Sequence, residues 1–161
     1  MQKLGIKKGI FSLIIFIIIV ELLGSLSSAF AGNIKLKYNV LNLPPLSPPD
    51  YIFGIVWPIL YLLIAIAGYL IIFSDRAPKR VKMVSSILFW LQLLLNFIWS
   101  IVFFHEHYIW GLVIILVLDI VVLLCIVFFR RINRLASNLL IPYMIWIIFA
   151  TYLTIGVTIL N

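Results

Sequence analysis

Five apolar stretches, each long enough to cross a lipid bilayer, constrain this chain more than any other feature. They cover residues 9–31, 51–73, 84–104, 108–129 and 136–160. A membrane-spanning helix needs about 20 mainly apolar residues, and barrel strands are much shorter. A water-soluble fold is excluded because 65% of the 161 residues are hydrophobic and only 11% are charged. The sequence therefore predicts an all-α integral membrane protein in which residues 1–161 form a single bundle of five transmembrane helices.

The first stretch allows two interpretations. Lys3, Lys7 and Lys8 precede an apolar run, and small residues follow at Ser28 and Ala31, which together are typical of a cleaved secretory signal. The apolar character nevertheless continues for the full length of a span. Retention as a first transmembrane helix is therefore favoured, and cleavage remains the alternative.

Positive charge is distributed unequally between the two predicted sides of the membrane. Ten of the 12 Lys and Arg residues lie at the N-terminus or in the second and fourth loops, whereas Lys35 and Lys37 lie in the first loop (residues 32–50). The positive-inside rule then predicts a cytoplasmic N-terminus and an external C-terminus. This rule also accounts for the net charge of +7 without a nucleic-acid partner.

The first loop contains four of the seven prolines, at positions 44, 45, 48 and 49. Proline fixes its own φ angle and restricts the residue before it, so this segment is expected to be stiff and extended. A stiff apolar loop suits either a lid over the helix bundle or a simple spacer.

Polar and aromatic side chains recur at helical spacing inside the predicted spans. Because polar groups are costly in lipid, such positions are where function is expected. One-sided stripes of this kind suit either a pocket for a flat ligand or hydrogen bonding between helices. The stripes consist of Gln92, Asn96, Trp99 and Phe103; of Trp57 and Tyr61; and of Trp146, Ala150 and Thr154.

Two acids, Glu21 and Asp119, lie within predicted spans with no Lys or Arg at the same depth. Asp119 suits a hydrogen bond to a neighbouring helix or to a ligand, and Glu21 is assigned to interfacial water. His105 and His107 flank Glu106 in the third loop, but no further ligand is near in sequence, so a metal site is not expected. No nucleophile–base pair or phosphate-binding loop is present, and no catalytic residue is assigned.

These features, taken in order from about Tyr38 to the C-terminus, resemble the TspO/MBR family, which comprises translocator proteins, tryptophan-rich sensory proteins and peripheral-type benzodiazepine receptors. The positions that carry the resemblance are Tyr38, Pro48 and Pro49 in the first loop, Trp57 and Tyr61, Gln92, Asn96, Trp99 and Phe103, Asp119, and Pro142, Tyr143, Trp146, Ala150 and Thr151.

The resemblance implies a five-helix bundle that retains its first helix and is usually a homodimer. It also implies a pocket under the first loop that binds porphyrins, related tetrapyrroles and aromatic amides, with no required cofactor. The candidate ligand-binding residues are Tyr38, Pro48, Pro49, Trp57, Tyr61, Gln92, Asn96, Trp99, Phe103, Asp119, Tyr143, Trp146, Ala150 and Thr154.

The sequence thus predicts a membrane receptor or sensor for tetrapyrroles. The alternatives are a transporter of such ligands, or a porphyrin-degrading photo-oxidative enzyme in which Trp57 and Trp146 would take part. Two departures from the family qualify the ligand range. Leu43 and Leu46 replace a lysine and a tryptophan in the first loop, and no basic residue follows Arg134, so the cholesterol-recognition pattern of animal members is missing.

Overall fold

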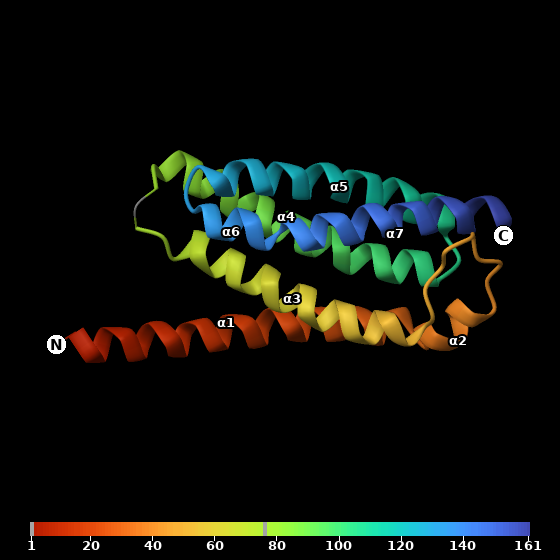
Figure 1. The fold of residues 1–161 in the computed structure, drawn as a ribbon, viewed down its shortest axis with the longest axis horizontal. Coiled ribbons are helices and arrows are strands. Elements are labelled where there is room, and N and C mark those ends of the chain that lie inside the picture. The colour runs from red at the N-terminus through yellow and green to blue at the C-terminus, as the bar shows by residue number, and fades with distance from the viewer. Residues whose placement is uncertain (1, 76) are drawn as a thin grey trace.

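The computed structural model describes residues 2–75 and 77–161, with side chains from residue 9 onward. Within this part of the chain all regular structure is helical (Figure 1). The helices are α1 (Gln2–Ala31), α2 (Ile34–Asn39), α3 (Tyr51–Ile72), α4 (Lys79–Phe104), α5 (Tyr108–Arg130), α6 (Arg134–Leu139) and α7 (Ile141–Leu160). Five segments are long and apolar enough to span a membrane: Gly9–Ala31, Tyr51–Ile72, Lys79–Phe104, Tyr108–Arg130 and Arg134–Leu160. The predicted all-α fold with five spans is confirmed.

The fifth span is two helices rather than the continuous one that hydropathy suggests. Asn133 caps α6 by accepting hydrogen bonds from the backbone of Leu135 and Ala136. The helix is then interrupted at Leu140, two residues before Pro142. Proline has no N–H to donate to the carbonyl one turn earlier, so the hydrogen-bond ladder breaks there and resumes in α7.

The bundle consists of helices that pack side by side along most of their length (Figure 1). α1 lies against α3 and α4, while α5 packs against α4, α6 and α7. Buried apolar residues from several helices form the core, including Val20, Ile64, Phe89, Leu118 and Ile147. The outward faces are also apolar, as expected for a surface that meets lipid.

The first loop lies across the end of the bundle that also holds the C-terminus (Figure 1). It begins with the short helix α2, which Asn33 caps by accepting a hydrogen bond from Leu36 N at 3.1 Å. Its proline-rich part is held to α7, where the Tyr152 hydroxyl donates to Pro45 O at 2.7 Å. A stiff loop was predicted, but the short helix was not, because its only local signal is the Asn33 cap.

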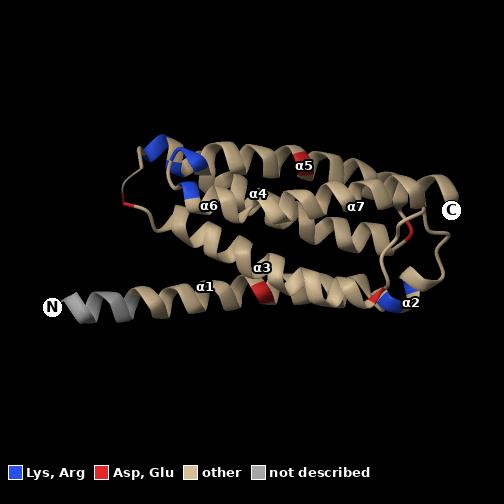
Figure 2. Cartoon of the chain, viewed as in Figure 1, with Lys and Arg blue, Asp and Glu red and all other residues tan. Residues whose placement is uncertain are grey.

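Basic residues gather at the end of the bundle opposite the first loop (Figure 2). There they occupy the start of α4, the connection between α5 and α6, and the start of α6. At the other end the basic residues are Lys35 and Lys37 of α2. The end of the bundle opposite the first loop is therefore the more basic one, as the sequence predicts.

Candidate ligand-binding cavity

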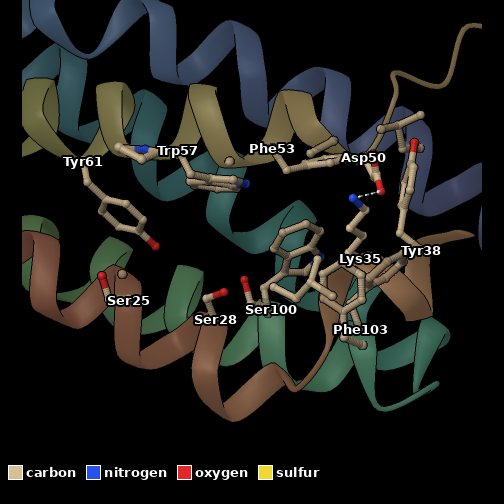
Figure 3. A pocket seen from close by; sticks show the side chains of 18 of the residues that line it. Ser25, Ser28, Lys35, Tyr38, Asp50, Phe53, Trp57, Tyr61, Ser100 and Phe103 are labelled. Carbon is tan, nitrogen blue, oxygen red and sulfur yellow. Dashed lines mark ion pairs between the residues drawn. The ribbon is translucent and has the colours of Figure 1, made fainter.

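A cavity of about 550 Å³ lies between α1, α3, α4 and α7, next to α2 and the first loop (Figure 3). This volume is within the range of about 300–1,000 Å³ that is usual for small-molecule sites. The residues that line it are Glu21, Gly24, Ser25, Ser28, Ile34, Lys35, Tyr38, Asp50, Tyr51, Phe53, Gly54, Trp57, Pro58, Tyr61, Trp99, Ser100, Phe103, Phe104, Ala150, Leu153, Thr154 and Val157.

One side of the cavity is aromatic. Trp57 and Tyr61 are one helical turn apart on α3, and their ring centroids are 5.5 Å apart. Trp57 also approaches Trp99 of α4 at 6.5 Å, and Trp99 stacks on Phe103 with centroids 5.5 Å apart. These separations are typical of interacting aromatic pairs. The rings of two helices thus form a connected apolar surface on which a flat molecule can stack.

The other side of the cavity carries hydroxyl groups. Ser25 and Ser28 of α1 and Ser100 of α4 lie across the cavity from Trp57 (Figure 3). Glu21 lies one turn before Ser25 on α1 and lines the same cavity. In the aromatic wall, the indole Nε1–H of Trp99 is buried without a hydrogen-bond partner among the described residues. The cavity therefore combines stacking surface with several available polar groups.

An ion pair marks the end of the cavity nearest the first loop. Lys35 Nζ lies 3.6 Å from Asp50 Oδ2, and Asn39 Nδ2 donates to the same oxygen at 3.0 Å. The hydrogen bond from Asn39, followed by the charge of Lys35, holds the pKa of Asp50 below its ordinary value. Burial raises the pKa of Tyr38, whose hydroxyl donates to Pro48 O at 2.8 Å.

A glycine on α1 makes room for one of the aromatic rings. A Cβ added at Gly24 would lie 2.6 Å from Tyr61 Cδ2, which is closer than such atoms can approach. Tyr61 consequently packs against the backbone of α1, and its hydroxyl reaches Asn96 of α4. Gly24 is therefore required by the position of the Tyr61 ring rather than by helix conformation.

The structure brings half of the predicted site residues to the cavity. Those that line it are Tyr38, Trp57, Tyr61, Trp99, Phe103, Ala150 and Thr154. The others are placed elsewhere: Pro48 and Pro49 in the first loop, Gln92, Asn96, Asp119, Tyr143 and Trp146 within the helices.

Asn96 and Tyr143 belong to a hydrogen-bonded bridge between three helices. The Tyr61 hydroxyl donates to Asn96 Oδ1, and Asn96 Nδ2 donates to the Tyr143 hydroxyl oxygen, each at 2.8 Å. Asp119 is part of a second bridge, in which Thr151 Oγ1 donates to Asp119 Oδ2 at 2.8 Å. The sequence allowed these side chains either to line a ligand pocket or to form hydrogen bonds between helices. In the structure Asn96, Tyr143 and Asp119 form hydrogen bonds between helices.

Gln92 and Trp146 lie outside both bridges. Gln92 is 1% exposed, and neither its amide oxygen nor its amide nitrogen has a partner among the described residues. Trp146 packs edge-on against Phe53, with ring centroids 5.9 Å apart, and Phe53 in turn lines the cavity. Trp146 thus supports the cavity wall from behind.

Sequence reasoning missed the polar wall. Glu21, which the sequence alone assigned to interfacial water, lines the cavity together with Ser25 and Ser28. Their spacing of four and three residues places them on one helix face and was the available signal. In the third loop, His105 Nδ1 lies 2.7 Å from Ile101 O, and in the described part of the chain no three His, Cys, Asp or Glu side chains form a metal-binding group.

The fold and cavity define a multi-pass α-helical membrane protein with an aromatic-lined chamber at one end of its bundle. Residues 15–160 match the TspO/MBR family, and the chain belongs to that family. It is 38% identical over 155 residues to the tryptophan-rich protein TspO of Archaeoglobus fulgidus, covering 89% of this chain and 96% of the relative. It is 31% identical over 122 residues to the translocator protein of Homo sapiens, covering 72% and 69%. The family resemblance read from the sequence is confirmed.

Proposed function

We propose that this protein is a membrane receptor that binds a porphyrin-type tetrapyrrole or a similar flat hydrophobic molecule in the cavity beside the first loop. The observation that carries the proposal is the connected surface formed by Trp57, Trp99 and Phe103 on one side of a cavity of about 550 Å³. Stacking on indole rings buries a large apolar area, and such contacts dominate binding energetics.

Polar groups around the aromatic surface support a ligand with a hydrogen-bonding edge. The Trp99 Nε1–H has no partner among the described residues, and a buried donor of this kind is costly to leave unpaired. A ligand acceptor placed against it would remove that cost. Ser28 and Ser100, which lie across the cavity from Trp57 (Figure 3), offer hydroxyls that can donate or accept.

The proposal includes an orientation and an assembly. The N-terminus is cytoplasmic and the C-terminus external, which is supported by the basic end of the bundle opposite the first loop (Figure 2). The cavity then lies toward the external side of the membrane. The protein is a homodimer and requires no cofactor; membership of the TspO/MBR family supports this part of the proposal. Aromatic amides are a second ligand class for the same cavity.

The test is a titration of protoporphyrin IX into the detergent-solubilised full chain, followed by tryptophan fluorescence and porphyrin absorbance. Trp57→Ala and Trp99→Ala are each expected to weaken binding by roughly tenfold or more, as for interface aromatics worth more than 1 kcal/mol. Ser28→Phe, which places a ring in the cavity from an exposed position, should block binding without removing a buried side chain.

The matched control is Trp110→Ala, because Trp110 is 67% exposed at the start of α5 and does not line the cavity. It should leave the affinity for protoporphyrin as in the unaltered chain. Far-UV circular dichroism verifies that each variant retains its helices. Saturable binding that persists in Trp57→Ala, Trp99→Ala and Ser28→Phe would exclude the cavity as the site.

Transport of the same ligands is a second candidate function, favoured by the similarity to the translocator protein of Homo sapiens. It predicts that liposomes containing the chain take up protoporphyrin faster than empty liposomes do. Uptake should fall in Ser28→Phe and persist in Trp110→Ala. A receptor alone would bind protoporphyrin under these conditions without accelerating uptake.

A further inference from the structure

Glu21 is the acid of the cavity that has no counter-charge. It lies on α1, ten residues before the end of that helix at Ala31, which corresponds to about 15 Å along the axis. The hydrocarbon core is about 30 Å thick, so Glu21 lies near its middle. An acid at this depth is costly and usually faces a partner or a functional cavity. Here it faces the cavity.

Lys35 lines the cavity and Lys37 lies two residues further on α2, and both are bound to groups other than Glu21. Lys35 pairs with Asp50 at 3.6 Å, and this is the ion pair found among the described side chains. Lys37 Nζ donates to Ala31 O at 2.9 Å, at the end of α1. The part of the chain that the structure describes therefore offers no cation to the Glu21 carboxyl group.

Hydroxyl groups continue the polar surface from Glu21 toward the first loop. Ser25 and Ser28 follow Glu21 on the same face of α1, and Ser100 of α4 lines the same cavity (Figure 3). The hydroxyl groups of these three serines make no hydrogen bond within the described part of the chain. The inner end of the polar wall is thus acidic, and the rest of it is neutral and able to hydrogen-bond.

We propose that Glu21 gives the cavity a further ligand class, flat aromatic molecules that carry a protonated nitrogen, which would pair with the Glu21 carboxylate while the rings stack on Trp57 and Trp99. This proposal rests on the proposed function and adds to the ligands of the same cavity. A cationic ligand supplies the counter-charge that the chain lacks, and hydrogen bonds between charged groups are stronger than those between neutral ones. A neutral ligand of the same shape would stack equally well but leave Glu21 unpaired.

A pair of ligands with the same rings tests this proposal. At neutral pH 9-aminoacridine is cationic and acridine is neutral. Equilibrium dialysis against the detergent-solubilised full chain should show at least about tenfold tighter binding of 9-aminoacridine, equivalent to about 1.4 kcal/mol. In Glu21→Gln, which keeps the size of the side chain, the ratio of the two affinities should fall toward one.

The control variant is Glu106→Gln, because Glu106 is an exposed acid of the third loop that does not line this cavity. It should keep the affinity ratio of the unaltered chain, which excludes a general effect of net charge or of micelle partitioning. An unaltered chain that binds both acridines equally, or a ratio that survives in Glu21→Gln, would overturn the proposal while protoporphyrin binding still supports the receptor function. Failure of all three ligands to bind would overturn both.

Discussion

Replacing Gly156 with alanine should release the first loop from α7. Gly156 faces Pro44 across this contact, and an added Cβ would lie 2.5 Å from Pro44 Cβ and 3.1 Å from Pro44 Cδ. Neither partner can yield easily, since one belongs to a helix backbone and the other is a proline ring. The methyl group must therefore push the proline-rich segment away from the helix.

The size of the effect follows from the contacts that hold the loop. Overpacking by one methyl group typically costs about 1–3 kcal/mol. The loop is held here by reciprocal hydrogen bonds between Asn42 and Asn161, both at 3.0 Å, and by the bond from Tyr152 to Pro45. Each is worth about 0.5–1.5 kcal/mol net. The cost of the added methyl group is similar in size to the free energy of the hydrogen bonds that hold the first loop against α7. A cost of about 1–3 kcal/mol should raise the population of molecules with a detached first loop about 5- to 150-fold.

Hydrogen exchange of the segment 40–50, measured by mass spectrometry on the detergent-solubilised chain, reports this change directly. Exchange should accelerate at least about fivefold in Gly156→Ala, and the affinity for protoporphyrin should fall with the closed fraction. Gly9→Ala is the matched control, since nothing lies within 4 Å of a Cβ added there. Exchange in Gly156→Ala at the unaltered rate would show that the contact with Pro44 does not hold the loop.

Two further predictions concern the helix bridge and the end of the cavity. Asn96→Leu should lower the free energy of unfolding, measured by titration with a denaturing detergent, by about 1–3 kcal/mol. The reason is that the hydroxyls of Tyr61 and Tyr143 lose the side chain to which both are hydrogen-bonded. An unchanged free energy of unfolding would show that this hydrogen-bonded bridge does not stabilise the bundle. Asn39→Ala should raise the pKa of Asp50 toward 3.8, followed by NMR of its carboxyl carbon. Because folding lowers the pKa of Asp50, its ionised carboxylate stabilises the folded chain at neutral pH, and this stabilisation is lost as the pH falls through the lowered pKa. An Asp50 titration midpoint that is the same in Asn39→Ala as in the unaltered chain would refute the role of Asn39.

The spans and the charge asymmetry could be read from the sequence because each depends on local composition. A run of about 20 apolar residues must become a helix in lipid whatever its neighbours are. The break in the fifth span follows equally locally from Pro142, although hydropathy alone does not show it. The short helix α2 depends on one cap at Asn33 and is therefore a much weaker signal.

The stripe of polar and aromatic residues on α4 shows what helical spacing alone cannot predict. Asn96 and Trp99 share a face by spacing, yet Trp99 lines the cavity while Asn96 bonds to two tyrosines beside it. Periodicity gives the angle between two side chains on one helix, but not the rotation of that helix against its neighbours. A few tens of degrees decide between a cavity wall and a helix–helix contact.

The sequence by itself determined that this chain is a five-span helical membrane protein of the TspO/MBR family, and which residues are polar or aromatic within the spans. The tertiary structure alone decided that Glu21 and the serines of α1 line the same cavity as Trp57, and that Asp119 accepts a hydrogen bond from Thr151. The physical reason is that lipid is as apolar as the protein core. Hydrophobicity therefore does not distinguish the inner from the outer face of a membrane helix, and only the packing of the helices does.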